Sequence, residues 1–432
     1  DSITANGDPT AGSQTISLPG ARTLTWPSSV KWNGGAAPTL DQKNFSGTDV
    51  NVINLLTRDE GVTWYGWETM SKSITTYEWW TWGNNHTGML GQNNTASYSS
   101  PIQIPGSWTG FNKEMGNNAT YGDVNLGAKA DGTLWAWGDN EYGALGQNNL
   151  VQYSSPVQVP GTDWGESYMS ASQNSFVIKS NGEMYGMGIN YQGSLGINAS
   201  GTNPNNNARS SPTQIPGTTW KSVTVANWAN LATKTDGTLW SWGYNVVGSL
   251  GLNNNTNYSS PVQIPGTTWD TVYSGNYHMF ATRTDGTLWA WGNNTSGVLG
   301  QNNKTRYSSP VQIPGTTWKK ATASEKSAGA VKTDGTLWVW GMNQSGVFGT
   351  NDTTDASSPR QVPGTTWNDI ASNSYIMYAS KTNGTLWAWG FNGNGELGQN
   401  DLTTRSSPIQ IPGKTVSFVS CGALYGKAFV EE

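Results

Sequence analysis

The 432-residue sequence predicts an all-β protein, a seven-bladed β-propeller preceded by a small β module. Three observations lead to this prediction. One unit recurs seven times, each unit alternates like short strands separated by turn residues, and no window carries a helical period. A repeat of about 50 residues suits a propeller blade of four strands, which cannot bury its faces alone and needs neighbours around a ring.

The repeat is clearest around the stretch TDGTLWAWGNN at residues 284–294. The glycine after its second tryptophan recurs seven times, with 49 to 55 residues between successive copies. Every unit continues with N-x-x-G-x-L/F-G, an Asn-rich turn, Ser-Ser-Pro and a Q-I/V-P-G step. In six units a tryptophan soon follows the Pro-Gly, so the unit has a fixed order of strand and turn signals.

Within a unit, the pattern predicts a β-hairpin. The segments ATRT and TLWAW flank Asp285-Gly286, a pair that favours the positive φ angles of a two-residue turn. In the second arm, Leu288 and Ala290 point to one face and Trp289 and Trp291 to the other. Since 18 of the 24 tryptophans occupy repeat-equivalent sites, we expect them to pack between blades. The structural repeat positions are Trp137, Trp242, Trp291, Trp340 and Trp389, each followed by Gly138, Gly243, Gly292, Gly341 or Gly390.

The ends of the repeat region predict how the ring closes. The first unit lacks the front half that the others have, whereas KTVSFVSCGALYGKAFV (residues 414–430) matches such a front half after the last unit. We therefore expect the N- and C-terminal halves of one blade to pair, which removes open sheet edges.

The unit A-x-K-T-D-G-T-L-W-x-W-G-x-N-x-x-G-x-L-G, followed by Ser-Pro, resembles the repeat of the regulator of chromosome condensation family over residues 76–432. The resemblance implies that family's seven-bladed propeller. Family members act as a nucleotide-exchange factor on a small GTPase, as a plant photoreceptor with a tryptophan cluster, and as a secreted inhibitor of β-lactamases. This sequence lacks the exchange factor's basic tail and matches no specific functional residues, so the resemblance implies a fold rather than an activity.

Residues 1–75 do not follow the repeat. The runs LTWPSSVKWNGGAAPTL (24–40) and DVNVINLLTRDEGVTWYGWE (49–68) resemble β modules near the ends of bacteriophage tail-fibre and appendage proteins. Glu60 stands where a second glycine would be more familiar in that pattern. We expect an attachment module over 1–75 and the propeller over 76–432; an ordinary β extension packed on the ring is the alternative.

Composition excludes several function classes. Only 12% of residues are charged and the net charge is -5, so no basic patch is available for nucleic acid. No apolar run is long enough for a membrane span. Cys421, the only cysteine, is expected to be a packed core thiol. With two histidines and no catalytic or metal motif, we expect no enzyme activity, no metal and no cofactor; a glycan-cleaving carboxylate pair brought together by folding is the remaining enzymatic alternative.

Differences among the copies mark where function could lie. The residue after W-G varies, and so do residues between the first two strands of a unit, which means that packing does not dictate them. Such loops are either a solvated rim or a binding surface. For His278 core packing is the favoured role, because repeats of this family commonly carry histidine there. The candidate binding surface is Tyr191, Trp228, Tyr244, Tyr277, His278, Lys326, Tyr375 and Phe391.

Together these patterns predict a non-enzymatic bacteriophage virion appendage protein on the virion surface or otherwise extracellular. Its partners would be a protein or surface glycan of a host cell, or neighbouring virion proteins, without nucleic acid or membrane insertion. A homo-oligomer, such as the trimer common among fibre proteins, is left open. The competing class is a bacterial secreted or cell-surface interaction propeller.

Overall fold

The computed structural model describes four strands within residues 1–74, and residues 75–109, 123–170, 173–201, 207–413, 415–422 and 424–431. The chain divides into two compact units, Asp1–Ile74 and Thr75–Glu432. The first unit holds a four-stranded sheet of order β1-β3-β4-β2, in which only the β2–β4 pair is parallel. Its strands are β1 (Ser13–Pro19), β2 (Val30–Trp32), β3 (Val50–Thr57) and β4 (Trp64–Thr69). Glu60 lies outside the described residues.

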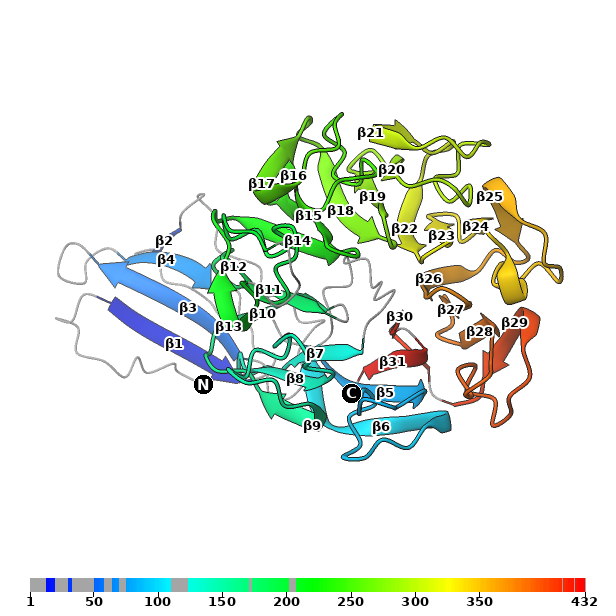
Figure 1. The fold of residues 1–432 in the computed structure, drawn as a ribbon. Helices are drawn as coiled ribbons and strands as arrows, with labels where there is room; N and C mark the ends of the chain where they lie inside the picture. Colours follow the sequence, from blue (N-terminus) through cyan, green and yellow to red (C-terminus); the bar gives the residue numbers. More distant parts are fainter. Residues whose placement is uncertain are drawn as a thin grey trace. The chain divides into compact units, whose positions relative to one another are not determined.

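The second unit is a ring of seven antiparallel blades, drawn around the circle in Figure 1, of which blades 1 and 2 share one seven-stranded sheet. Five blades, numbered 3 to 7, are separate sheets of four consecutive strands. Blade 3 has β10 (Trp164–Ser170), β11 (Asn174–Lys179), β12 (Met184–Gly188) and β13 (Arg209–Gln214); blade 4 has β14 (Trp220–Val225), β15 (Ala229–Lys234), β16 (Leu239–Gly243) and β17 (Tyr258–Ile264). Blade 5 has β18 (Trp269–Ser274), β19 (His278–Arg283), β20 (Leu288–Gly292) and β21 (Tyr307–Gln312).

Blades 6 and 7 repeat the same order. Blade 6 has β22 (Trp318–Ala323), β23 (Ser327–Lys332), β24 (Leu337–Gly341) and β25 (Ala356–Val362), with a short 3-10 helix, η2 (Gln344–Gly346). Blade 7 has β26 (Trp367–Ser372), β27 (Ile376–Lys381), β28 (Leu386–Gly390) and β29 (Arg405–Ile411). Among the described residues, no helix is long and apolar enough to cross a membrane.

Blade 1 closes the ring. Its order is β30 (Phe418–Cys421), β31 (Tyr425–Glu431), β5 (Thr76–Gly83) and β6 (Tyr98–Thr109), so two strands come from each end of the repeat region. β31 lies beside β5 in Figure 1, with Phe429 paired to Trp79. The end of β6 continues into blade 2, which has β7 (Val124–Ala128), β8 (Leu134–Gly138) and β9 (Tyr153–Gln158). The expected seven-bladed ring, closed by both halves of one blade, is confirmed.

The second tryptophan of each W-x-W pair joins neighbouring blades. Trp291 is fully buried, and its indole N–H donates to the carbonyl oxygen of Ser249 in the preceding blade at 2.9 Å. A buried indole without an acceptor would be costly, so this bond fixes the blade spacing. The same bond runs from Trp82 to Glu396, Trp137 to Met89, Trp242 to Ser194, Trp340 to Val298 and Trp389 to Val347. Blade 3 carries Met187 at this position, which fills volume but donates nothing.

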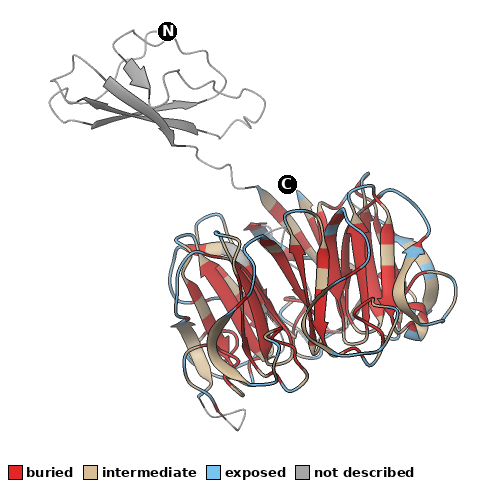
Figure 2. Ribbon diagram, turned by 90° about the horizontal axis from the view of Figure 1, so that it is seen from above, coloured by how far each residue is buried: buried red, intermediate tan, exposed pale blue. Residues whose placement is uncertain are grey.

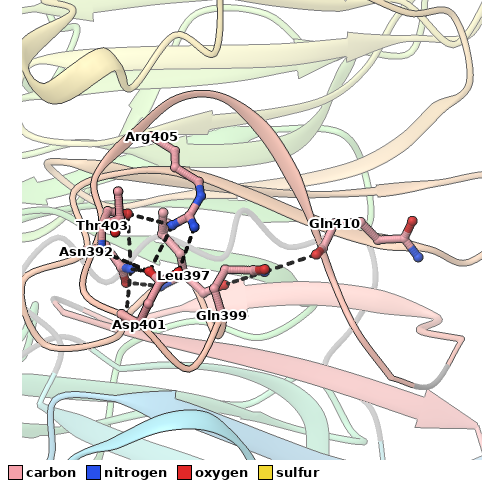
Figure 3. A network of polar contacts seen from close by, with 7 residues as sticks. All are labelled: Asn392, Leu397, Gln399, Asp401, Thr403, Arg405 and Gln410. Carbon is pink, nitrogen blue, oxygen red and sulfur yellow. Dashed lines mark hydrogen bonds and ion pairs between the residues drawn. The ribbon is translucent and has the colours of Figure 1, made fainter.

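A buried asparagine organises the long loop after the third strand of each blade. In blade 7, the Asn392 side chain accepts from the Leu397 N–H at 2.8 Å and donates to the carbonyls of Asp401 and Thr403 (Figure 3). Arg405 closes the loop with an ion pair to Asp401 at 2.7 Å. Polar backbone groups in a buried loop need partners, and one amide supplies three of them. The N-x-x-G-x-L/F-G stretch is therefore a structural signature.

The hairpin turn differs from the expected two-residue turn. β19 and β20 do pair antiparallel, but the loop holds three residues, Thr284, Asp285 and Gly286. Only Gly286 has a positive φ, +78°, and the Asp285 carboxylate accepts from the N–H and hydroxyl of Thr287. This is the arrangement of a turn followed by a left-handed glycine, the three-residue alternative to the Asp-Gly turn. Burial follows the strands and exposure the loops (Figure 2).

Candidate binding face

One end of the blades carries the candidate residues. Because consecutive strands are antiparallel, the first loop and the loop after the third strand of every blade lie at the same end, and the Asp-Gly hairpins lie at the other. Tyr277 lies in the first loop of blade 5, directly before β19. Tyr244 follows β16 of blade 4. We call the end with these loops the binding face.

The binding face presents seven equivalent pairs of residues, here called rim pairs. In each pair, the residue after the W-G glycine donates its backbone N–H to the carbonyl of the residue before the second strand, at 2.8 to 3.0 Å. The backbone is thus the same in all blades, while the side chains differ. The rim pairs are Leu424–Asn84, Asp123–Asp139, Gln173–Ile189, Trp228–Tyr244, Tyr277–Asn293, Lys326–Met342 and Tyr375–Phe391.

The glycine within each rim pair cannot be replaced without moving this backbone. Gly292 has φ +99°, and a Cβ atom there would overlap the carbonyl oxygen of Tyr277. Gly243 has φ +102° and would meet the Trp228 carbonyl in the same way. Positive φ and close backbone approach are the two conditions that only glycine meets at low cost. The glycines therefore hold the loops whose side chains form the face.

Four candidate residues from three neighbouring blades form one aromatic cluster. Trp228 lies edge-on to Tyr191, with ring centroids 4.8 Å apart, and edge-on to Tyr244 at 5.9 Å. Tyr244 also contacts Tyr191 at 6.4 Å and Tyr277 at 6.3 Å. All four side chains are half-buried, so each keeps part of its surface open to solvent. The four residues come from three consecutive repeats, and the packing of blades 3, 4 and 5 side by side brings them together.

Neutral amides hold the aromatic cluster in place. The Trp228 indole N–H donates to the Gln173 side chain at 2.9 Å, and the Asn227 amide donates to the Tyr277 hydroxyl at 2.8 Å. Partial burial raises the pKa of Tyr277, which therefore stays a neutral phenol. Trp228 has φ +68°, a left-handed conformation that is costly for a bulky residue. The cluster is thus fixed by its neighbours rather than free in solvent.

The other candidates do not join the cluster. Tyr375 and Phe391 form a separate pair in blade 7, with centroids 6.4 Å apart. Lys326 in blade 6 is half-buried and lies 3.6 Å from the Glu325 carboxylate. His278 is 1% exposed, so its assignment to the binding surface is wrong. It is the first residue of β19, so its side chain is already part of the sheet and lies inside the blade. Burial lowers the pKa of His278 to about 3.

Blade 2 contributes an acidic part of the binding face. Asp123 is mostly buried, and this burial raises its pKa to about 6, against the opposing effect of His86. His86 lies with its Nε2 atom 3.4 Å from an Asp123 oxygen, and Asp139 stands in the same rim pair. Among the described residues, no group of three or more His, Cys, Asp or Glu side chains is placed to hold a metal ion.

Sequence reasoning missed Asp123, Gln173 and Leu424, which are structural equivalents of Trp228. Their units have irregular first loops, so the register was not visible from the motif alone. Aligning each copy backwards from its W-G glycine would have placed Asp123 and Gln173, because both precede that glycine by fifteen residues, as Trp228 does. Asn227 carried no signal in the sequence.

Comparison with protein families identifies the repeat. The model described as "Regulator of chromosome condensation (RCC1) repeat" matches residues 131–165, 236–282, 285–330, 334–374 and 383–425. A second model of this repeat matches 269–298. The matched ranges include Tyr244, Tyr277 and Lys326 but not Trp228 or Tyr375.

Curated relatives match parts of the chain. Human "Protein RCC2" is 29% identical over 125 residues, which is 28% of this chain and 23% of that protein. "Ultraviolet-B receptor UVR8" of Arabidopsis thaliana is 25% identical over 176 residues, 40% of this chain and 38% of the receptor. The chain thus spans about a quarter to two-fifths of the length of these relatives.

Solved structures share the fold. The crystal structure of human WBSCR16 superposes with a TM-score of 0.70 at 19% identity, over 82% of this chain and 99% of that one. Yeast RCC1 (Prp20), crystallised with Kap60, gives 0.69 at 18% identity, over 83% and 90%. With the seven blades and the matched repeats, these findings show that the chain belongs to the regulator of chromosome condensation repeat family.

Proposed function

We propose that this protein is a non-enzymatic binding protein and that the aromatic cluster of blades 3 to 5 is its main contact site. The observation that carries the proposal is the convergence of Tyr191, Trp228, Tyr244 and Tyr277 from three blades. Tryptophan and tyrosine are the usual anchors of binding interfaces, and loops on a rigid frame are their usual place.

The backbone strain at Trp228 supports the same proposal. Among the described first-loop members of the rim pairs, Trp228 alone has a positive φ. Strained residues persist where the surrounding structure holds them, and such strain is concentrated at ligand sites. Packing alone does not require it, because Tyr277, Lys326 and Tyr375 accept the same backbone hydrogen bond without it.

We further propose that the protein is a virion appendage that contacts a host-surface protein or glycan, or a neighbouring virion protein, outside the cell. The support is the resemblance of residues 1–75 to tail-fibre β modules, the separate sheet of the first unit, and the low charge of an Asn-, Ser- and Thr-rich surface. The first unit would attach to the particle and the propeller would face the target.

The binding site is tested with the full chain, labelled with a fluorophore, on host-type cells and on a glycan array. The double variant Trp228→Gly, Tyr244→Ala should lose at least tenfold in binding, since hot-spot aromatics contribute about 2 kcal/mol or more each. A matched variant on the opposite side of the ring, Tyr375→Ala, should bind as the parent does. Unchanged binding by the double variant would rule out the aromatic cluster.

The appendage assignment is tested on particles. Mass spectrometry of purified virions should detect the chain, and a chain lacking residues 1–74 should leave the propeller soluble and absent from particles. Incorporation of the truncated chain into virions would contradict the attachment role. If only this experiment failed, the binding site would still stand, and the protein would be interpreted as a secreted or cell-surface propeller.

A further inference from the structure

One recurring feature of the blades is a tryptophan that begins the first strand and fills a slot beside the W-x-W pair. In blade 7, the Trp367 ring lies 6.2 Å from that of Trp387 and 5.8 Å from that of Trp389. Lys381 completes the slot, with its ammonium over Trp367 and Trp387 at 4.9 and 4.1 Å. The tryptophans that begin this slot in six blades are Trp108, Trp164, Trp220, Trp269, Trp318 and Trp367.

Blade 1 has the slot without the tryptophan. The Val416 N–H donates to the Gly384 carbonyl at 2.8 Å, as the Trp367 N–H donates to Gly335 at 2.9 Å, so Val416 is the seventh copy of the position. The position of the slot lysine also differs, because blade 1 carries Val430 there. Val430 lies five residues after the start of its second-strand segment at Tyr425, as Lys381 lies five residues after Ile376.

The substitution leaves a cavity between blades 7 and 1. Its volume is about 200 Å³, and its walls include Trp80, Trp82, Pro412, Gly413, Val416 and Val430. The neighbouring glycines give an independent measure of the empty space. A Cβ atom on Gly364 would meet the Trp367 ring at 3.2 Å, whereas a Cβ atom on Gly413 would meet nothing within 4 Å.

We propose that this open slot binds an indole ring, supplied by a tryptophan side chain of a partner polypeptide. The chain itself shows which group fits, because six equivalent slots hold a tryptophan that follows a Pro-Gly step. The size agrees, since an apolar cavity of about 150 Å³ already accepts benzene and indole has one further ring. The replacement of the cation by Val430 leaves an apolar wall suited to a neutral ring.

Two of the six filled slots also provide a hydrogen-bond acceptor for the indole, whereas the indole N–H of the other four slot tryptophans has no partner among the described residues. The indole N–H of Trp367 donates to the Pro363 carbonyl, and that of Trp269 to the Pro265 carbonyl, both at 3.2 Å. The equivalent residue at the open slot is Pro412. The slot lies at the hairpin end of the blades, near Gly384, so it is independent of the aromatic cluster on the binding face.

The proposal is tested with the full chain and two probes, N-acetyl-tryptophanamide and a peptide that copies residues 363–368, PGTTWN. Calorimetry should show one site per chain, tighter binding of the peptide, and no binding of N-acetyl-leucinamide. Val416→Trp should fill the slot in cis, weaken both probes at least tenfold and raise the Tm. If N-acetyl-tryptophanamide bound more tightly than the peptide, the polypeptide source would be overturned.

Two controls keep the result specific. Leu150→Trp adds an indole at a position that is 61% exposed and should leave probe binding unchanged. The Trp228→Gly, Tyr244→Ala variant should also retain it, which separates this slot from the proposed function. If the parent binds neither probe, or if a folded Val416→Trp variant binds as the parent does, the slot is not an indole site.

Discussion

Tyr277 and His278 are consecutive in the chain but belong to two different regions of the molecule. The Tyr277 ring lies half-buried in the aromatic cluster of the binding face, whereas the His278 ring is 1% exposed and packs edge-on against Phe280 at 5.7 Å. The boundary between rim and interior is therefore one residue wide. Trp228, Tyr277, Lys326 and Tyr375, whose carbonyls accept the rim-pair hydrogen bond, are half-buried, whereas His278 lies one residue further along and inside the sheet.

The interior and the rim also differ in what their atoms do. In the interior, the same indole and amide groups make the same hydrogen bonds in blade after blade, so substitutions there should change stability. At the rim, the constant bonds are all backbone bonds and the side chains are free to differ. Substitutions there should change binding with little effect on stability.

The largest effect is expected from Trp291→Ala in the interior. The variant loses a fully buried ring and leaves the Ser249 carbonyl without its indole donor. The free energy of unfolding should fall by about 3–5 kcal/mol, measured by urea denaturation. Leu150→Ala, at an exposed position, should stay within about 0.5 kcal/mol of the parent. A loss below about 1 kcal/mol for Trp291→Ala would contradict the interior role.

An intermediate effect is expected from His278, and it should depend on pH. Burial holds its pKa at about 3, below the ordinary value of 6.5, and its Nε2 atom has no hydrogen-bond partner among the described residues. As the pH falls, His278 is therefore protonated in the unfolded chain at a higher pH than in the folded chain. Compared with a variant that lacks this imidazole, the parent should lose about 2–3 kcal/mol of stability between pH 6.5 and 4.5, through one proton. Asp123, whose pKa is raised to about 6, acts in the opposite direction in both proteins and cancels in the comparison.

The variant His278→Ile should remove this one-proton slope, because Ile376 fills the equivalent position of blade 7. The slope comes from urea denaturation at several pH values. His86→Gln, at the exposed histidine, should keep it. If the slope of the free energy of unfolding against pH were the same in His278→Ile as in the parent, another group would cause the acid sensitivity.

The smallest effect on stability is expected from Trp228→Gly at the rim. Glycine relieves the left-handed backbone at φ +68° but loses the contacts to Tyr191 and Tyr244. These changes oppose each other, so the free energy of unfolding should stay within about 1 kcal/mol of the parent. If urea denaturation showed a much larger loss in the free energy of unfolding, Trp228 would behave like the interior residues, and the distinction between rim and interior would fail.

Much of the fold could be predicted from residues alone. The seven units, the arms of the hairpin around Asp285-Gly286 and the shared closing blade follow from a long motif repeated at nearly constant spacing. The prediction of a two-residue turn was wrong. The Asp285 carboxylate accepts a hydrogen bond from the Thr287 N–H and so stabilises a three-residue loop, and the turn preference of the Asp-Gly pair does not report this contact. The assignment of His278 was wrong because a one-residue change of position moves a side chain from loop to sheet.

The candidate site was predicted less completely. The sequence marked Tyr191, Trp228, Tyr244 and Tyr277 as free to vary but gave no reason to group them, since they lie in three repeats. The open slot at Val416 was visible as a missing tryptophan, yet whether neighbours would collapse into the space depended on packing.

By itself, the sequence determined the number of blades, their strand order and the residues that packing requires, because local patterns repeated seven times leave few alternatives. Only the tertiary structure decided which variable residues meet and which slot stays empty. Both depend on how neighbouring blades pack. The packing of blades 3 to 5 brings variable loop residues into one cluster, and ring closure through the pairing of β31 with β5 places blade 1, where Val416 stands at the slot position, beside blade 7.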